Sequence, residues 1–239
     1  MDSEFLIDCI LPKREISLVA GPSGAGKTRW LLNMLVNEWQ RGMPVLGYES
    51  HPCKWVYVAS DRSLASVHRT LRDIGINPES INIIPAWGKD SKSLPQIFDA
   101  IKASGAGLAV IEGFGGYAEE GTPNAVRKYL RAVQHMIECD DITPIGVVES
   151  PKMKPHDTYE NPRQRVSGAA AWAHYTETIF LVEPEDVSDP RLPTRKLYVC
   201  PRNARGLRLK GQFDDRGRLV FQPDVFETPE VHEPRRKRR

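Results

Sequence analysis

Short apolar runs alternate with amphipathic stretches along the first 150 residues. The runs have the length of buried strands, and they cover residues 15–20, 55–59, 81–84, 108–111 and 145–148. Between them apolar residues recur at helical spacing, which predicts helices over 28–41, 63–73, 94–103 and 123–138. This strand–helix alternation predicts an α/β fold with a mainly parallel, twisted sheet flanked by helices.

The pattern changes after Ser150. Residues 151–167 are polar and carry three prolines, which predicts a long loop. Strands are predicted over 178–182, 196–200 and 207–213, and a hairpin through 214–217 leads to a last strand at 219–222. We therefore expect antiparallel strands to extend the parallel sheet. Residues 1–224 are predicted to form one domain, and 225–239 a disordered basic tail.

A glycine-rich segment between the first strand and the first helix carries the strongest chemical signal. Gly21-Pro-Ser-Gly-Ala-Gly-Lys-Thr28 fits the P-loop pattern GxxxxGK[ST]. In a P-loop, backbone N–H groups surround phosphate oxygens, the lysine reaches the β- and γ-phosphates, and the last hydroxyl ligates Mg²⁺. The predicted nucleotide contacts are Gly21, Pro22, Ser23, Gly24, Ala25, Gly26, Lys27, Thr28 and Arg29. The predicted cofactors are ATP and Mg²⁺.

Acidic residues follow three of the predicted strands. Glu112 ends the apolar run 108–111, Glu149 ends 145–148, and Asp61 follows Ser60 after 55–59. A carboxylate directly after buried positions is costly without a cation, so Glu112 is the expected second Mg²⁺ ligand beside Thr28. Parallel strands end at one edge of the sheet, where nucleotides bind.

Further motifs follow the P-loop in a recognisable order. They are Ala59-Ser-Asp61, Arg69-Thr-Leu-Arg-Asp-Ile-Gly75, Val110-Ile-Glu-Gly-Phe114, Val147-Val-Glu-Ser-Pro-Lys152, Arg165-Val-Ser-Gly-Ala-Ala-Ala-Trp172 and Cys200-Pro-Arg-Asn203. The chain resembles the RecA-like P-loop ATPases over about 16–221, and most of all the plasmid replicative helicase RepA group, relatives of the DnaB-type hexameric helicases. The resemblance implies a homo-oligomer, usually a hexameric ring, with ATP bound between subunits.

The resemblance also implies two loops that grip single-stranded DNA, or RNA, in the ring channel. They correspond to 113–124 and 151–167. Tyr117 and Tyr159 would stack on bases, and the basic side chains expected to contact phosphates are Lys152, Lys154, His156, Arg163 and Arg165. The alternative is that 151–167 is an ordinary solvated insertion.

Arg202 matches the arginine finger of the family, with Arg205 close behind it. Such a finger stabilises the γ-phosphoryl group bound to a neighbouring subunit. The chain departs from the family at Ser60, where a catalytic glutamate is usual, at Glu112, usually aspartate, and at Glu149, often histidine or glutamine. Catalytic candidates are therefore Lys27 and Arg202, with Asp61, Glu112 or Glu149 as the general base.

Composition narrows the class of protein. Hydrophobic residues make up 40% and charged residues 27% of the 239, which excludes a fully disordered or fibrous chain. No apolar run is long enough to span a membrane, no secretory signal is recognisable, and the four cysteines form no CxxC pair, so we expect a cytoplasmic location. Of the net charge of +2, the five basic residues at 235–239 contribute +5, which leaves the rest slightly acidic.

Two function classes remain open. The first is an oligomeric ATP-dependent motor on single-stranded nucleic acid, acting in replication or recombination, with a partner protein from that machinery. The second is an ATP-binding assembly switch with little turnover, which the missing glutamate favours. A small-molecule kinase is a weaker third option because no arginine-rich lid is recognisable.

Overall fold

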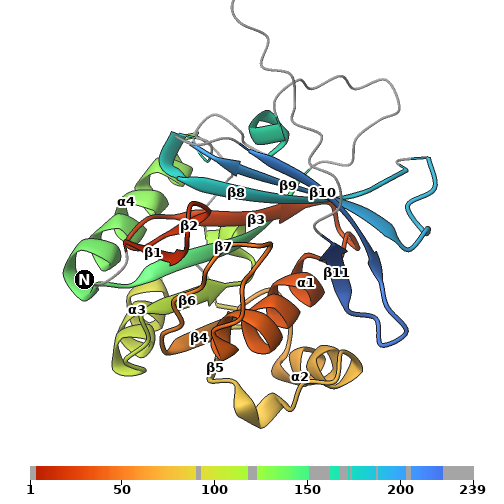
Figure 1. The fold of residues 1–239 in the computed structure, drawn as a ribbon. Coiled ribbons are helices and arrows are strands. Elements are labelled where there is room, and N and C mark those ends of the chain that lie inside the picture. The colour runs from red at the N-terminus through yellow and green to blue at the C-terminus, as the bar shows by residue number, and fades with distance from the viewer. Residues whose placement is uncertain are drawn as a thin grey trace, which may run out of the picture.

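The computed structural model describes residues 4–89, 93–117, 123–150, 162–166, 172, 174–186, 188–202 and 206–222. Within these residues the fold is one large twisted sheet with helices on both faces (Figure 1). The strand order is β11-β10-β9-β8-β3-β7-β6-β4-β5. The strands are β3 (Ser17–Gly21), β4 (Trp55–Ala59), β5 (Ile83–Pro85), β6 (Leu108–Ile111), β7 (Thr143–Glu149), β8 (Thr178–Pro184), β9 (Thr194–Pro201), β10 (Leu207–Phe213) and β11 (Leu219–Gln222).

The sheet has a parallel part and an antiparallel part. Strands β8, β3, β7, β6, β4 and β5 pair in parallel, while β9, β10 and β11 add antiparallel neighbours beyond β8. The turn between β10 and β11 closes through the Gly217 N–H to Asp214 carbonyl bond of 2.8 Å. The predicted α/β class, with antiparallel C-terminal strands, is confirmed.

Helices α1 (Lys27–Asn33), α2 (Leu64–Asp73), α3 (Leu94–Ala103) and α4 (Pro123–Asp140) lie on the two faces. Alternate residues of each central strand point to opposite faces. On β3, Val19 packs in the cluster with α1 and α2, whereas Leu18 and Ala20 pack in the cluster with α3 and α4. The continuous apolar runs of the sequence therefore reflect burial on both faces.

The predicted helix 28–41 is less regular than its periodicity suggests. After α1 the chain continues as a π-helical turn, Met34–Glu38, and a 3₁₀ turn, Trp39–Arg41. It ends at Gly42, whose φ of 67° gives the left-handed cap expected there. The Trp39 indole N–H donates to the Leu6 carbonyl at 2.9 Å, so this turn is tied to the N-terminal segment.

Two short strands at the N-terminus were not anticipated. β1 (Phe5–Ile7) and β2 (Leu11–Pro12) pair as a separate antiparallel ribbon. Shorter turns are η3 (Pro78–Ser80), η5 (Phe114–Tyr117) and η7 (Pro162–Arg165). The turn η5 lies within the loop predicted over 113–124, and α4 begins at Pro123, where the helix 123–138 was predicted. The described part of the loop predicted over 151–167 includes η7. No described helix is long and apolar enough to cross a membrane.

Candidate functional site

The parallel strands deliver the predicted site residues to one edge of the sheet, here called the carboxyl edge. Gly21 pairs in register with Glu149, and Asp61 and Glu112 follow the ends of β4 and β6. A cavity of about 850 Å³ opens there. Its lining includes Lys27, Thr28, Asp61, Arg62, Glu112 and Glu149. The cavity therefore brings the acidic residues at the ends of β4, β6 and β7 together with the P-loop, as the sequence pattern predicted.

The P-loop needs glycine at two of its positions for different reasons. At Gly26 the backbone has φ 95°, and a Cβ would lie 2.6 Å from the Phe213 ring. At Gly21 a Cβ would lie 2.1 Å from the Val182 carbonyl oxygen on the neighbouring strand β8. The loop therefore sits between β8 and the β10–β11 hairpin, with α1 beginning directly after it.

Lys27 is held at the base of this loop. Its side chain is buried, and Nζ donates to the carbonyl oxygens of Gly21 and Pro22 at 2.8 and 3.0 Å. Burial lowers the pKa of Lys27, while Glu149, Asp61 and Glu112 oppose that change. Lys27 thus lines the same cavity as the three carboxylates, with its ammonium group bonded to the backbone of the P-loop.

Thr28 and Glu112 both line the cavity and are in direct contact. The Thr28 hydroxyl donates to Glu112 Oε1 at 2.9 Å. The Glu112 side chain is 2% exposed, so its carboxylate is buried. Thr28 lies in the first turn of α1 and Glu112 follows β6, so two oxygen ligands predicted from separate motifs are in direct contact.

Arg62 also belongs to this site, although the sequence motifs did not indicate it. Its Nε donates to Glu112 Oε1 and Oε2 at 3.0 and 3.1 Å, and Nη2 donates to Glu112 and, at 2.9 Å, to Thr28 Oγ1. Burial alone would lower the pKa of Arg62, but the hydrogen bonds that Arg62 donates to Glu112 and the negative charge of Glu112 outweigh burial and raise the pKa. Its place in the sequence is informative, because Arg62 directly follows the Ser60–Asp61 pair at the end of a predicted strand.

Ser60, at the position where a catalytic glutamate is usual, does not face the cavity. The Ser60 hydroxyl donates to the Glu112 backbone carbonyl, and Ser60 is absent from the cavity lining among the described residues. Asp61 lines the cavity with its side chain 53% exposed. Burial raises the pKa of Asp61, the Glu112 charge adds to this, and Arg62 opposes it. Asp61 and the exposed Glu149 are thus the solvent-facing carboxylates of the site.

The antiparallel extension completes the side of the cavity next to the P-loop. Arg195 donates from Nε to the Ala25 carbonyl at 3.1 Å and lies 4.9 Å from the centre of the Phe213 ring. Arg29 donates from Nη1 to the Gly217 carbonyl at 3.1 Å. Phe213 and Gly217 line the cavity, so a nucleotide bound at the P-loop would lie beside this hairpin.

The residues present fit a Mg²⁺ ion held together with nucleotide phosphates. Thr28 and Glu112 supply oxygen donors, and the buried Glu112 carboxylate already lies against a cation, the Arg62 guanidinium. Mg²⁺ is commonly bound through one or two protein groups plus phosphates and water. In the described part of the chain no cluster of three or more His, Cys, Asp or Glu side chains could hold a metal alone.

Arg202 lies at the opposite edge of the sheet from Lys27. It follows β9, which runs antiparallel to β8, and its N–H bonds the Glu177 carbonyl at 2.7 Å just before β8 begins. Its side chain donates to the His174 carbonyl and lies 3.7 Å from a Glu177 carboxylate oxygen. Arg202 therefore cannot reach the nucleotide site of its own chain. Arg205 lies outside the described residues.

Two predicted nucleic-acid contacts are engaged with the protein itself. Arg163 donates to the carbonyls of Thr176 and Cys200 at 2.6 and 2.7 Å, and Arg165 pairs with the buried Glu183 at 2.5 Å. These contacts give both arginines a structural role in securing η7 against β8 and β9. Lys152, Lys154, His156 and Tyr159 lie outside the described residues, as does the tail.

The expectation that Tyr117 stacks on bases is wrong. Tyr117 is 4% exposed, and its ring centre lies 6.0 Å from that of Tyr129 on α4. The apolar cluster with Phe114 and Trp172 buries it.

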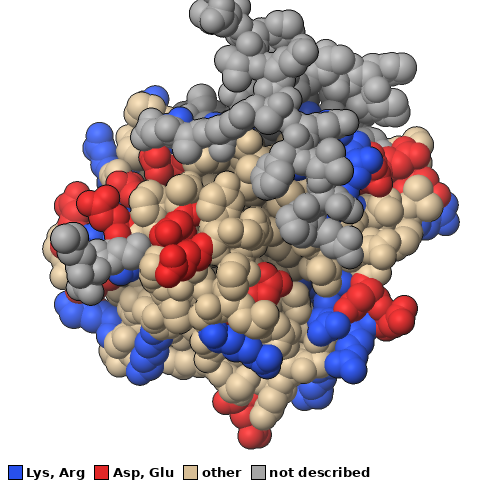
Figure 2. Space-filling model, in the orientation of Figure 1, with Lys and Arg blue, Asp and Glu red and all other residues tan. Residues whose placement is uncertain are grey.

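On the face shown in Figure 2, basic and acidic side chains are interspersed rather than gathered by sign.

Comparisons with known proteins agree with this geometry. The chain matches a family model described as an AAA domain over residues 3–147. Its fold is similar to the crystal structure of a KaiC-like protein from the hyperthermophilic archaeon Pyrococcus horikoshii OT3, with a TM-score of 0.60, 15% identity, 93% of this chain and 98% of that chain covered. No curated protein matches it. Because the family model covers more than half of the chain, the protein belongs to the AAA domain family of P-loop ATPases, here with a RecA-like α/β core.

Proposed function

We propose that the protein binds ATP with Mg²⁺ at the P-loop and hydrolyses it. One observation carries the proposal: Thr28 of the P-loop contacts Glu112 of a separate strand end, within the cavity that Lys27 also lines. A chance glycine-rich turn would not place a buried carboxylate opposite its own threonine. The test is direct titration of the purified chain with ATP and Mg²⁺, followed by measurement of phosphate release.

The residues divide the binding of the triphosphate between them. Backbone N–H groups of the P-loop and the first turn of α1 face the phosphates, whose charge the helix N-terminus favours. Lys27 exchanges the carbonyls of Gly21 and Pro22 for phosphate oxygens. Mg²⁺, when bound, neutralises charge on the phosphates, and Thr28 and Glu112 are the groups that would hold it.

We assign the orientation of the attacking water to Asp61. Its carboxylate faces the cavity, is part solvated, and has a pKa raised above its ordinary value, which improves it as a proton acceptor. Glu149 is the alternative because it lines the same cavity from β7. The two are distinguished by Asp61→Asn and Glu149→Gln: the base is the residue whose variant keeps ATP affinity but loses turnover.

We propose further that the protein acts as a homo-oligomer on single-stranded DNA or RNA, as its resemblance to the RepA group suggests. The position of Arg202 supports this, because Arg202 lies at the edge of the sheet opposite the carboxyl edge and can serve only the nucleotide of a neighbouring chain. The expected results are ATPase stimulation by single-stranded DNA and partial recovery of activity when Arg202→Ala and Lys27→Ala chains are mixed. A monomer that hydrolyses ATP at an unchanged rate with DNA contradicts this part alone.

An ATP-binding switch with slow turnover is the second candidate. The observation in its favour is the replacement of the usual glutamate by Ser60, whose hydroxyl bonds a backbone carbonyl instead of facing the cavity. A switch predicts tight ATP binding and nucleotide-dependent assembly with little phosphate release. Measured side by side, binding and single-turnover hydrolysis separate the two.

A further inference from the structure

The Arg62 guanidinium lies on the two oxygens that would ligate Mg²⁺. Nη2 donates both to Thr28 Oγ1, at 2.9 Å, and to Glu112 Oε1, while Thr28 donates to the same Oε1 at 2.9 Å. The three groups form a closed triangle in which each contacts the other two. A cation bound to Thr28 and Glu112 would have to take the place of this guanidinium.

The electrostatics of Glu112 explain why a cation is needed there in every state. Its side chain is 2% exposed, and a buried carboxylate without a partner is strongly disfavoured. Arg62 meets it with a two-nitrogen fork, Nε and Nη2, which is the strongest geometry available to an arginine–carboxylate pair. Lys27, the other nearby cation, is instead bonded to the carbonyls of Gly21 and Pro22.

Apart from Glu112 and Thr28, little holds the Arg62 side chain in place. It lies between the end of β4 and the N-cap of α2, Ser63, and its side chain is 28% exposed, compared with 2% for Glu112. Its remaining contacts are weak: Nη1 lies 3.3 Å from Thr70 Oγ1 and Nε lies 3.9 Å from Asp61 Oδ1. The guanidinium can therefore swing toward the cavity, which Arg62 and Asp61 both line, without unfolding a strand.

We propose that Arg62 and Mg²⁺ compete for Thr28 and Glu112, so that the nucleotide site carries its own exchangeable cation. Arg62 keeps Glu112 neutralised until nucleotide-bound Mg²⁺ displaces it, and the displaced guanidinium then faces the phosphates. Metal affinity is thereby lowered, and metal binding is coupled to the segment that also carries Asp61. The inference deepens the proposed function and rests on its assignment of the Mg²⁺ ligands.

The test removes the charge while keeping a hydrogen-bond donor, with Arg62→Gln. Thermal unfolding is measured in EDTA and in Mg²⁺, and Mg²⁺ binding in the presence of a non-hydrolysable ATP analogue is measured by calorimetry. In EDTA, Tm should fall by about 5–10 °C because Glu112 loses its cation. Mg²⁺ should restore much of that loss and should raise the Tm of the wild type much less. Mg²⁺ affinity should increase about tenfold or more.

Three further variants keep the test decisive. Arg62→Lys retains a positive charge and should lie between wild type and Arg62→Gln in both measurements. Arg62→Gln combined with Glu112→Gln removes the unpaired charge, so it should regain stability in EDTA and lose its Mg²⁺ response. Arg218→Gln is the matched control, because it removes a half-buried arginine whose partner is Asp214, and it should not change the Mg²⁺ dependence.

The outcomes separate the inference from the proposed function. If the wild type binds the ATP analogue with Mg²⁺ but Arg62→Gln has wild-type Mg²⁺ affinity and no Mg²⁺-dependent gain in Tm, competition is excluded and the ATP site stands. If Arg62→Gln weakens Mg²⁺ binding, Arg62 assists the metal instead of competing, which also overturns the proposal. If the wild type binds no nucleotide, the proposed function itself fails.

Discussion

Thr28 and Glu112 lie 84 positions apart in the sequence, yet the threonine hydroxyl donates a 2.9 Å hydrogen bond to the glutamate carboxylate. The contact exists because β3, which leads into the P-loop, and β6, which ends before Glu112, run parallel on either side of β7. It joins the two halves of a phosphate and metal site. The predictions below test the parts that hold this site in place.

Replacing Gly26 by alanine should damage the P-loop more than replacing Gly24. Both residues have positive φ, 95° and 78°, but only at Gly26 would the new Cβ lie 2.6 Å from the Phe213 ring. We expect a loss of about 1 kcal/mol of unfolding free energy for Gly24→Ala and about 2–4 kcal/mol for Gly26→Ala. Denaturant unfolding measures both. Equal losses would show that backbone conformation alone explains the glycine.

Arg165 should prove to be a structural residue. It pairs with Glu183, which is buried, and burial raises the pKa of Glu183 while Arg165 opposes that change. Arg165→Met removes the opposing charge, so we expect a loss of about 3 kcal/mol at neutral pH and less in acid, where Glu183 is protonated. Adding Glu183→Gln should recover much of it. Unchanged stability with weaker single-stranded DNA binding would restore the nucleic-acid role.

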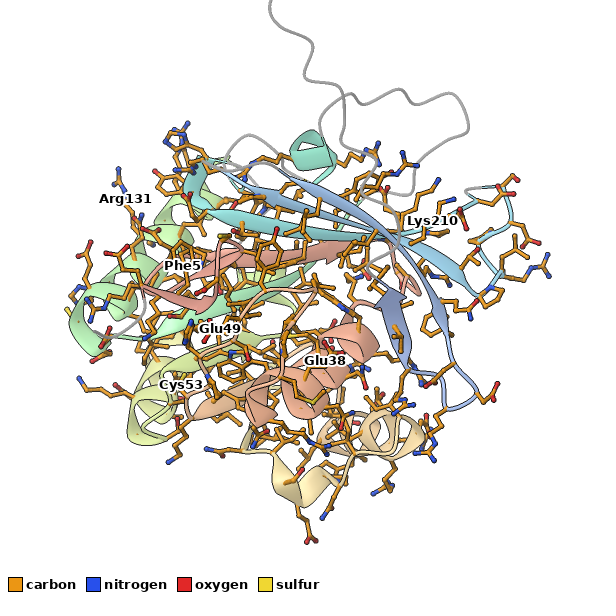
Figure 3. All side chains as sticks on the ribbon, in the orientation of Figure 1. Phe5, Glu38, Glu49, Cys53, Arg131 and Lys210 are labelled. Carbon is orange, nitrogen blue, oxygen red and sulfur yellow. The ribbon has the colours of Figure 1, made fainter. Side chains whose placement is uncertain are left out.

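Glu38, labelled in Figure 3, gives the fold a pH dependence unrelated to the nucleotide. It lies in the π-helical turn after α1, and burial raises its pKa from 4.5 to about 7. The unfolded chain releases this proton at lower pH than the folded one, so stability falls as pH rises from about 4.5 to about 7. Glu38→Gln should therefore stabilise the protein at pH 8 by about 1–2 kcal/mol, less than the full shift implies because the group is only part-buried. At pH 4 the variant should match the wild type.

Asp61 predicts the acid limb of the ATPase profile. Its pKa is raised from 3.8, first by burial and then by Glu112. If Asp61 is the general base, hydrolysis falls as pH drops through a pKa above the ordinary aspartate value, because protonated Asp61 cannot accept the proton. Asp61→Asn should lower kcat about a hundredfold or more with little change in ATP affinity. If Glu149→Gln abolishes hydrolysis and its fall at low pH while Asp61→Asn leaves both unchanged, Glu149 is the general base.

Much of the fold could be predicted because burial on both faces leaves a continuous apolar run in each central strand. The ranges 207–213 and 219–222 agree with β10 and β11, and 94–103 agrees with α3. β1 and β2 escaped because two or three residues carry no periodicity. The π-helical turn was not predicted. It leads directly to Trp39, whose indole N–H bonds the Leu6 carbonyl, a contact that the sequence pattern does not show.

The site was predictable where a residue follows a strand and unpredictable where a partner comes from elsewhere. Glu112, Asp61 and Glu149 were found because parallel strands end at one edge. Arg62 was missed because its role depends on Glu112, 50 positions away. Arg163 looked like a phosphate contact because sequence cannot show that the carbonyls of Thr176 and Cys200 accept its hydrogen bonds.

The most direct test of the account is calorimetric titration of the wild type and of Lys27→Ala with ATP and Mg²⁺. Lys27 is buried with a lowered pKa, so its removal costs the fold little, while the lost charge-assisted bonds to phosphate should weaken binding about ten- to a hundredfold. Equal Tm values establish that the variant is folded. The account predicts one ATP per wild-type chain and a large loss of affinity in the variant; a wild type that binds no ATP, or a folded Lys27→Ala with unchanged affinity, contradicts it.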